Sequence, residues 1–436
     1  MLKRGDYSMN SVYIVKGNII YTSRPAEFAV IPNGYMIVRD GRIAYCGESI
    51  PSEFESYPVE DYGDNLIIPG FVDTHAHAPQ FCNRGLGMDK ELLPWLETYT
   101  FPEEAKFSDL DYAKTVYSAF VNELWRYGTT RSILFGTIHK ESTLLLMRLL
   151  SEAGLSAFVG KVNMDRNSPD YLIEDTDQSL HDTRVWLEEA RQFGPLVRPI
   201  VTPRFVPSCT SRLMSGLGDL AVEYNVPIQS HLSENHGEIE WVHSLHPDSS
   251  SYTDVYCEHR LMGTVPTVMA HCIHLSDEEM ERMHETKTMV AHCPYSNVNL
   301  SSGIAPIRKL LNHGISIALG SDISGGHDIS MAKVLTEAVG LSKMKWAEVD
   351  ASYASLTLPE AFYMATKGGG QFFGDVGSFE TGYEFDALVI DDHELFDPNE
   401  RSIEERLERW LYIGDDRHIV GRYVAGKLLD EPPMAM

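Results

Sequence analysis

The feature that most constrains the fold is an alternation, repeated along most of the chain, of short apolar runs with longer stretches of helical spacing. A short apolar run between turn residues is typical of a buried strand, and parallel strands are joined by helices. Eight such runs in sequence predict an α/β fold with a (β/α)₈ TIM barrel. The runs lie at residues 65–77, 128–136, 155–162, 197–205, 226–234, 265–272, 287–293 and 314–322.

One of the connecting stretches has a clear helical pattern. Between residues 108 and 127, Ser108 suits the N-terminus of a helix, and Gly128 follows its expected end. One face of this helix carries the apolar side chains of Ala113, Val116, Tyr117, Phe120 and Leu124. The interval 293–314 is short for a connecting helix, and it is the weakest step of the eight-unit pattern.

The two chain ends have the short-strand pattern of a β domain. In "YMIVRDGRIAYCG" (35–47), the pair Asp40-Gly41 lies between β-rich runs and predicts a hairpin. Similar runs recur near the other end, at 384–391 and 418–429. We therefore expect the two ends to form one small β domain together. The expected limits are 1–68 and 376–436 for its two parts and 69–375 for the barrel.

Chemically reactive side chains gather at one end of the expected strands. In a (β/α)₈ barrel the active site lies at the C-terminal ends of the strands. Six of the eight expected strands place a His, Asp, Glu or Arg there, and a random scatter of 17 histidines would seldom do so. These residues are His75 and His77 after the first strand, Arg204 after the fourth, His231 and Glu234 after the fifth, His271 after the sixth, His292 after the seventh and Asp322 after the eighth.

This pattern predicts a metal site. Residues i and i+2 of a strand point to the same side, so the two histidines of a His-x-His pair can converge on one ion. Three imidazoles with one carboxylate suit a divalent transition metal, with zinc the default and iron the alternative. We assign His75, His77, His231 and Asp322 as the ligands. Arg204, rather than a lysine, follows the fourth strand and favours one metal ion over two.

Two further residues are candidates for proton transfer. Glu234 follows the ligand His231 by three residues and is free to be a general acid or base. His271 is a fifth ligand or a second base, and its position alone does not separate these roles. His292 repeats the Ala-His-Cys pattern of His271, and we expect it to be a supporting residue.

Composition excludes several other classes of function. The chain has 36 Lys and Arg against 63 Asp and Glu, a formal net charge of -27, which disfavours nucleic acid and anionic membranes as partners. The N-terminus does not have the pattern of a signal peptide, and no apolar run approaches a membrane span. Six scattered cysteines without a C-x-x-C pair predict reduced thiols and a cytoplasmic setting.

The ordered motifs of the chain resemble the amidohydrolase superfamily and, within it, the guanine deaminase family. The His-x-His of 75–77 and the Ser-Asp of 321–322 are general to the superfamily. More specific to the narrower family are "WLETYTFPEE" (95–104), "TPRF" (202–205) and "AHCPYSNVNLSSG" (291–303). The similarity runs in order over nearly the whole chain.

The resemblance implies a metal-bearing barrel with a β-sandwich domain built from both chain ends, and a homodimer. It also implies hydrolysis of guanine to xanthine and ammonia, with one zinc ion per chain. Glu234 would shuttle protons, aided by Asp322, while His271 would hydrogen-bond the attacking water or the tetrahedral centre. The residues expected to line the purine are Gln80, Arg204 at its carbonyl oxygen, Phe205 against its ring, His77, His231 and Glu234.

Three alternatives are weighed against this expectation. The zinc deaminase design with an H-x-E and a P-C-x-x-C motif is excluded, because the chain has no P-C-x-x-C. A deaminase or chlorohydrolase acting on another heterocycle, such as an adenosine derivative or a triazine, would use the same fold. The segment "FCNRGLGM" (81–88) departs from the family pattern and leaves selectivity among guanine analogues open. A non-catalytic scaffold is disfavoured, because every expected ligand and Glu234 are present.

Overall fold

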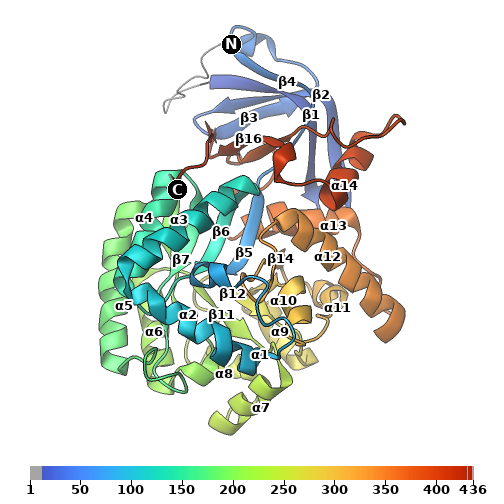
Figure 1. The fold of residues 1–436 in the computed structure, drawn as a ribbon. Coiled ribbons are helices and arrows are strands. Elements are labelled where there is room, and N and C mark those ends of the chain that lie inside the picture. The colour runs from blue at the N-terminus through green and yellow to red at the C-terminus, as the bar shows by residue number, and fades with distance from the viewer. Residues whose placement is uncertain (1–11, 430, 435–436) are drawn as a thin grey trace. The chain divides into compact units, whose positions relative to one another are not determined.

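The computed structural model describes residues 12–429 and 431–434. They divide into two compact units, both containing helices and strands (Figure 1). The first unit comprises the described residues of Met1–Val72, Leu124–Arg131 and Thr357–Pro433. The second comprises those of Asp73–Glu123, Ser132–Leu356 and Met434–Met436.

The first unit is built on one seven-stranded sheet with strands from both chain ends, as the sequence predicts. Its order is β17-β16-β15-β4-β1-β2-β3, and β15 from the C-terminal part pairs antiparallel with β4 from the N-terminal part. The strands are β1 (Val12–Arg24), β2 (Glu27–Arg39), β3 (Arg42–Gly47), β4 (Val59–Pro69), β15 (Ala387–Ile390), β16 (Ile419–Val424) and β17 (Lys427–Leu428).

The predicted hairpin is confirmed. Arg39 of β2 pairs with Arg42 of β3, and the two residues between them, Asp40 and Gly41, have φ values of 53° and 75°. Two consecutive positive φ values are what a type I′ turn requires, and this turn matches the twist of the strands that it joins.

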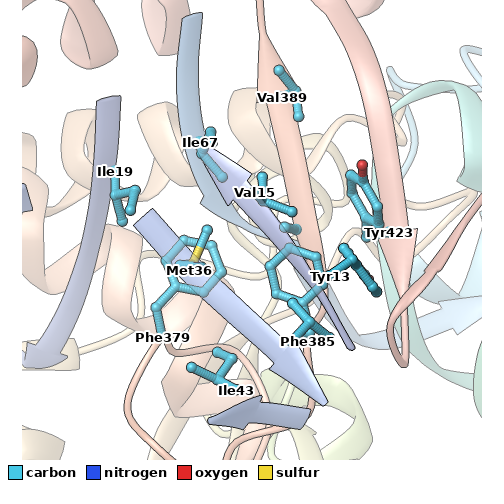
Figure 2. Close-up of a cluster of buried hydrophobic side chains, with 12 residues drawn as sticks. Tyr13, Val15, Ile19, Met36, Ile43, Ile67, Phe379, Phe385, Val389 and Tyr423 are labelled. Carbon is cyan, nitrogen blue, oxygen red and sulfur yellow. The ribbon is translucent and has the colours of Figure 1, made fainter. Parts of the chain in front are cut away.

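The core of this unit also combines both chain ends (Figure 2). Tyr13 and Val15 of β1 pack in the same buried cluster as Phe385 and as Val389 of β15. These side chains are at most 1% exposed. Helices α13 (Leu358–Tyr363) and α14 (Ile403–Ile413) belong to the same unit.

A buried ion pair stabilises the first unit, and we expect its loss to be costly. Arg131 donates from Nε to Asp386 at 2.6 Å and from Nη2 to Glu384 at 2.7 Å, and the Asp386 side chain is fully buried. Removing one partner of such a pair leaves an uncompensated charge in the interior. Arg131→Met should therefore lower the free energy of unfolding by about 3–5 kcal/mol, measured by urea denaturation.

The pair of Arg184 with Glu223 supplies the control, because both of its side chains are largely exposed. Arg184→Met should change the free energy of unfolding by no more than about 1 kcal/mol. Equal effects of the two substitutions would show that burial does not set the strength of the Arg131 pair.

The eight predicted strands, one within each expected apolar run, lie in the second unit except for residues 71–72 and 129–131, which belong to the first. They form two four-stranded sheets, β5-β6-β7-β9 and β11-β12-β13-β14, and the recorded pairs within them are parallel. The strands are β5 (Phe71–His77), β6 (Thr129–Phe135), β7 (Ser156–Gly160), β9 (Val197–Pro199), β11 (Ile228–Leu232), β12 (Thr267–His271), β13 (Met289–His292) and β14 (Ile317–Leu319). The run 65–77 is divided between β4 and β5, which belong to different sheets.

Helices separate these strands along the chain and surround them in Figure 1. The helix predicted over 108–127 is confirmed as α3 (Leu110–Arg126). The short interval 293–314 holds two short helices, α10 (Pro294–Asn299) and α11 (Ile307–Asn312). The other connecting helices are α4 (Lys140–Ala153), α5 (Thr176–Ala190), α6 (Ser211–Tyr224), α7 (His236–Leu245), α8 (Tyr252–Glu258), α9 (Asp277–Glu285) and α12 (Met331–Met344). Among the described residues, no helix combines the length and the apolar character that a membrane span needs.

Backbone contacts join the two sheets at both edges. On one side, the short strands β8 (Val162–Asn163) and β10 (Thr202–Pro203) pair in parallel, and Val201 bridges to Ile228 of β11. On the other side, the Asp322 N–H donates to the His75 carbonyl, and the His77 N–H donates to the Ile323 carbonyl, both at 2.8 Å. The segment after β14 therefore lies directly beside the end of β5.

Candidate active site

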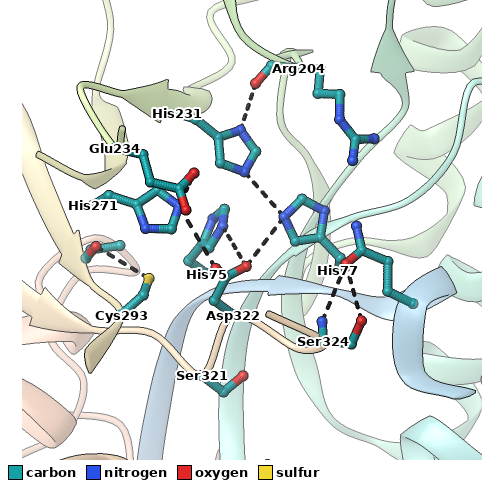
Figure 3. A network of polar contacts seen from close by, with 12 residues as sticks. His75, His77, Arg204, His231, Glu234, His271, Cys293, Ser321, Asp322 and Ser324 are labelled. Atoms are coloured by element: carbon teal, nitrogen blue, oxygen red, sulfur yellow. Dashed lines mark hydrogen bonds and ion pairs between the residues drawn. The ribbon is translucent and has the colours of Figure 1, made fainter. Parts of the chain in front are cut away.

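The predicted site residues converge at the C-terminal ends of the parallel strands (Figure 3). His75 and His77 are on β5 with their rings on the same side, as strand geometry requires. His231 is on β11 and His271 ends β12, while Asp322 follows β14 by three residues. The structure thus brings together residues that are separated by up to about 250 positions in the sequence.

The four predicted metal ligands lie within contact distance of one another. The Nε2 atoms of His77 and His231 are 3.1 Å apart. Asp322 Oδ1 lies 3.2 Å from His75 Nε2 and 3.4 Å from His77 Nε2. Two groups have ligand atoms within 4.8 Å of one another: His75 with His77 and His231, and His75 with His271 and Asp322. The position of His271 therefore leaves both of its expected roles open.

The hydrogen bonding of these histidines fits a metal ion. His231 Nδ1 lies 2.6 Å from the Arg204 carbonyl oxygen, which only accepts, so Nδ1 carries the hydrogen. In the neutral ring Nε2 then presents a lone pair to the cluster, an orientation typical of ligating histidines. His75 Nε2 is buried, and it faces Asp322 Oδ1 at 3.2 Å without a well-directed hydrogen bond. Nitrogen and carboxylate atoms in this arrangement suit zinc or iron.

Burial keeps the ligand imidazoles neutral, and the neighbouring imidazole groups keep the Asp322 carboxylate ionised. Burial lowers the pKa of His75 and holds the pKa values of His77 and His231 well below their usual range. For Asp322, burial alone would raise the pKa, but the imidazoles of His75 and His271 outweigh it and lower the pKa. Neutral imidazole and ionised carboxylate are the forms that bind a cation.

Beside this cluster, Glu234 and His271 form a second pair. His271 Nε2 lies 3.4 Å from Glu234 Oε2 and 3.7 Å from Asp322 Oδ2. Burial raises the pKa of Glu234 to about 7, so this carboxyl can exchange a proton near neutral pH. Ser302 donates to Glu234 Oε1 at 3.2 Å, and Asn297 Oδ1 lies 3.0 Å from His271 Nδ1.

Buried carboxylates hold the backbone of the site. Asp73 accepts hydrogen bonds from the backbone N–H groups of His75 and Ser321, at 3.2 and 2.9 Å, and ties β5 to the segment after β14. Glu238 accepts from the Glu234 N–H at 2.9 Å. His271 and Asp322 have positive φ values of 70° and 48°, a conformation that non-glycine residues adopt only where the surroundings enforce it. The site is therefore held rigidly before any ligand binds.

A cavity opens onto these groups, and its lining combines apolar side chains with a few convergent polar ones, as is typical of small-molecule sites. Except for His75, all the predicted ligand and substrate residues line it, together with an apolar wall that the sequence did not predict. The wall comes from α1 (Leu92–Trp95), from Leu96 and from Leu300. The lining residues are His77, Gln80, Leu92, Trp95, Leu96, Arg204, Phe205, His231, Glu234, His271, Leu300 and Asp322.

One functional contact was also missed by the sequence reasoning. Arg204 donates from Nη1 to both carboxylate oxygens of Glu104, at 3.0 and 2.7 Å. Gln80 donates from Nε2 to the same carboxylate at 2.8 Å. Glu104 ends the motif "WLETYTFPEE", which was the signal that could have drawn attention to it.

The seventh strand contributes a buried histidine outside the metal groups. His292 is 2% exposed, and burial lowers its pKa to about 3. It belongs to neither group of clustered ligand atoms. Lys161, at the end of the third strand, pairs with Glu174 at 2.6 Å and so has a structural partner.

Comparison with known proteins gives a consistent result. Residues 66–429 match the pattern described as the amidohydrolase family. The guanine deaminase of Dictyostelium discoideum is 41% identical over 442 residues, covering 95% of this chain and 97% of the relative. That of Mus musculus is 39% identical over 437 residues, covering 95% and 96%. A crystal structure of guanine deaminase from C. acetobutylicum, with bound guanine in the active site, superposes with a TM-score of 0.94 at 51% identity and covers 96% of this chain and 100% of that one.

Proposed function

Because this chain belongs to the amidohydrolase family and, within it, to the guanine deaminases, we propose that it hydrolyses guanine to xanthine and ammonia. One structural observation carries the proposal. The group of three imidazoles and Asp322, the Glu234–His271 pair, and the Arg204–Gln80 pair all contribute to the lining of a single cavity. A metal site, a proton carrier and hydrogen-bond donors for a heterocycle are thus available to one bound molecule.

The metal is proposed to be one zinc ion per chain, with iron as the alternative. His75, His77, His231 and Asp322 would hold it, supported by the tautomer of His231 and by the buried Nε2 of His75 that faces Asp322. When bound, such an ion supplies a water with a pKa lowered from about 15.7 towards 7.

The residues of this chain would then move the protons. Glu234 takes a proton from the attacking water and delivers it to the purine ring nitrogen beside C2. Asp322 aids this transfer, and His271 hydrogen-bonds the oxygen that adds to C2. The C2 carbon gains the hydroxyl oxygen, the remaining hydrogen of that hydroxyl passes to the amino group, and the C2–N bond breaks to release ammonia and leave the C2 carbonyl of xanthine. Burial of Glu234 and His271 strengthens each of these charge interactions relative to water.

The other side of the cavity would orient the base. Arg204 donates to the purine carbonyl oxygen, Gln80 donates beside it, and Phe205 packs against the ring. All three side chains are buried and line the cavity. Leu92, Trp95 and Leu96 supply the apolar surface that excludes water from the base.

The finer architecture is also a proposal. We infer that the two parallel sheets close into a (β/α)₈ barrel, supported by the backbone contacts at both of their edges. We also propose that the two chain ends form a β-sandwich domain. Its two parts would span 1–68 and 376–436, and the barrel would span 69–375. A cytoplasmic setting is supported by the six free cysteines, and a homodimer is proposed from the family alone.

The proposed function is tested by ammonia release from purified protein of known metal content. We expect guanine to be converted to xanthine and ammonia in equal amounts. The panel includes adenine, adenosine derivatives and triazines, which the same fold could accept. Turnover of one of these compounds in place of guanine would assign a different substrate and reject the proposal. If no compound of the panel is turned over, the result would support a non-catalytic scaffold.

A further inference from the structure

The first two residues of the motif "WLETYTFPEE", Trp95 and Leu96, belong to the apolar wall of the cavity, but its acidic end has no role in the proposed reaction. Its last four residues belong to α2 (Phe101–Ala105), and Glu104 of this helix is only 1% exposed. A buried carboxylate needs partners, because an unpaired charge in the interior costs several kcal/mol. Glu104 finds its partners in Arg204 and Gln80, the two residues that are proposed to bind the purine.

The contacts of α2 fix the guanidinium group of Arg204. Both oxygens of Glu104 accept from Nη1, and the Arg204 side chain is 4% exposed. The ring of Phe101, from the same helix, lies 5.3 Å from the guanidinium carbon. The Nε and Nη2 atoms of Arg204 have no hydrogen-bond acceptor among the described residues. These donors are available to a ligand in the cavity, while Glu104 holds the rest of the group.

The same carboxylate also fixes the amide of Gln80. Because a carboxylate only accepts, the contact at 2.8 Å requires the Nε2 side of the amide to face Glu104. The amide oxygen then accepts from the Ser324 N–H at 3.3 Å. With its oxygen already engaged, the amide has one further N–H to offer. The polar edge formed by Arg204 and Gln80 therefore presents donors only.

We propose that Glu104 is a positioning residue that makes this edge a donor-only surface and so selects purines with a 6-oxo group. The inference rests on the proposed function, because it assigns the edge to the purine carbonyl. The carbonyl oxygen O6 and the imidazole nitrogen N7, which lie on one edge of such a purine, offer two acceptors to these donors, whereas N1 beside the carbonyl carries a hydrogen. A 6-amino group would place a donor against donors, and an unsubstituted carbon would leave the buried guanidinium without an acceptor.

Binding of hypoxanthine and purine tests this assignment, because these bases differ only by the 6-oxo group and the hydrogen that it places on N1. The parent protein should bind hypoxanthine more tightly, as measured by inhibition or calorimetry. We define the preference as the dissociation constant of purine divided by that of hypoxanthine. Glu104→Gln should reduce this ratio by about tenfold or more, since it removes a charge-assisted contact. If Glu104→Gln only destabilises the protein, it should weaken the binding of both bases equally. An unchanged ratio would therefore overturn the proposal. So would a parent that does not prefer hypoxanthine.

Glu103 provides the matched control. It precedes Glu104 in α2 and is 5% exposed, but its carboxylate pairs with Lys106 and Tyr112 instead of the cavity residues. Glu103→Gln should leave the ratio within about twofold of the parent value. An equal drop in both variants would mean that the helix, and not the Glu104 contact, governs the preference.

A second comparison covers the case in which Glu104→Gln leaves the buried guanidinium unpaired and the protein does not fold. The variant Glu104→Gln/Arg204→Met/Gln80→Met removes both charges and both donors of the edge, and it is compared with Arg204→Met/Gln80→Met. Because Glu104 acts through Arg204 and Gln80, the added substitution should change the ratio by less than about threefold. A further drop of tenfold or more would contradict the proposal.

Guanine turnover by the parent separates this inference from the proposed function. A parent that does not deaminate guanine but loses its hypoxanthine preference in Glu104→Gln would reject the function and retain the positioning role. If the parent deaminates guanine but the Glu104→Gln variant keeps the preference for hypoxanthine, the proposed function stands and the positioning role is rejected.

Discussion

Glu234→Gln should lower kcat for guanine about a thousandfold, because the amide keeps the size of the side chain but cannot carry the proton. Glu234 faces the cavity beside His271 and lies outside the predicted ligand set. The variant should therefore keep its metal and bind guanine with little change in affinity. Steady-state kinetics, metal analysis and binding of guanine to the inactive variant measure these three quantities.

Glu279 supplies a control for replacing a buried carboxylate by an amide. It is 8% exposed, lies in the first turn of α9, and accepts from Thr253 and from the Ser276 N–H. Glu279→Gln should keep kcat within about threefold of the parent, since it has no contact with the reacting groups. If the Glu234→Gln variant retains its metal and has a kcat within tenfold of the parent value, Glu234 does not carry the proton.

His231→Ala should abolish both metal binding and turnover. The substitution removes one of four ligands, and without the ion the pKa of the attacking water returns to about 15.7. We expect less than about a tenth of the parent metal content and turnover lowered at least a thousandfold. Metal analysis of the purified variant and the ammonia assay measure the two effects.

His292→Ala is the matched comparison, because His292 is also an imidazole at a strand end and it is buried. It lies outside both groups of clustered ligand atoms, so this variant should keep more than half of its metal. Equal loss of metal from the two variants would argue that the ligand set is wrongly assigned, whereas full retention in His231→Ala would exclude His231 as a ligand.

Most of the strand positions could be predicted because an apolar run is a local signal. Each of the eight runs contains a parallel strand, and Asp40-Gly41 forms the predicted turn. The division of the run 65–77 between β4 and β5 was not predictable, because both halves are apolar and only the pairing partners differ. The two short helices within 293–314 were also missed, since neither is long enough to show a helical period.

The candidate site was predictable where strand geometry alone places the side chain. His75 and His77 lie on the same side of β5, and His231 lies near the C-terminal end of β11, so their convergence follows from local pattern and fold class. Asp322 and His271 depend on left-handed backbone conformations that the sequence does not indicate. The apolar wall of Leu92 and Trp95 comes from the long connection after β5, whose path depends on tertiary packing.

The partners of the site residues were the least predictable part. Asn297 meets His271 across 26 residues, and Glu104 meets Arg204 across 100. Neither contact has a fixed spacing or a periodic pattern. A motif such as "WLETYTFPEE" can identify the segment, but the choice of Glu104 over Glu103 as the residue that faces Arg204 requires the direction of each side chain on α2.

The central claim is that one metal ion, held by the imidazoles and Asp322, enables this chain to deaminate guanine. Its most direct test is a titration of metal-stripped protein with zinc, in which xanthine formation from guanine is followed at each addition. The account predicts no turnover at the start and a linear rise that ends at about one equivalent per chain. Full turnover by the stripped protein, or no turnover of guanine when zinc and iron have each been added to saturation, would contradict it.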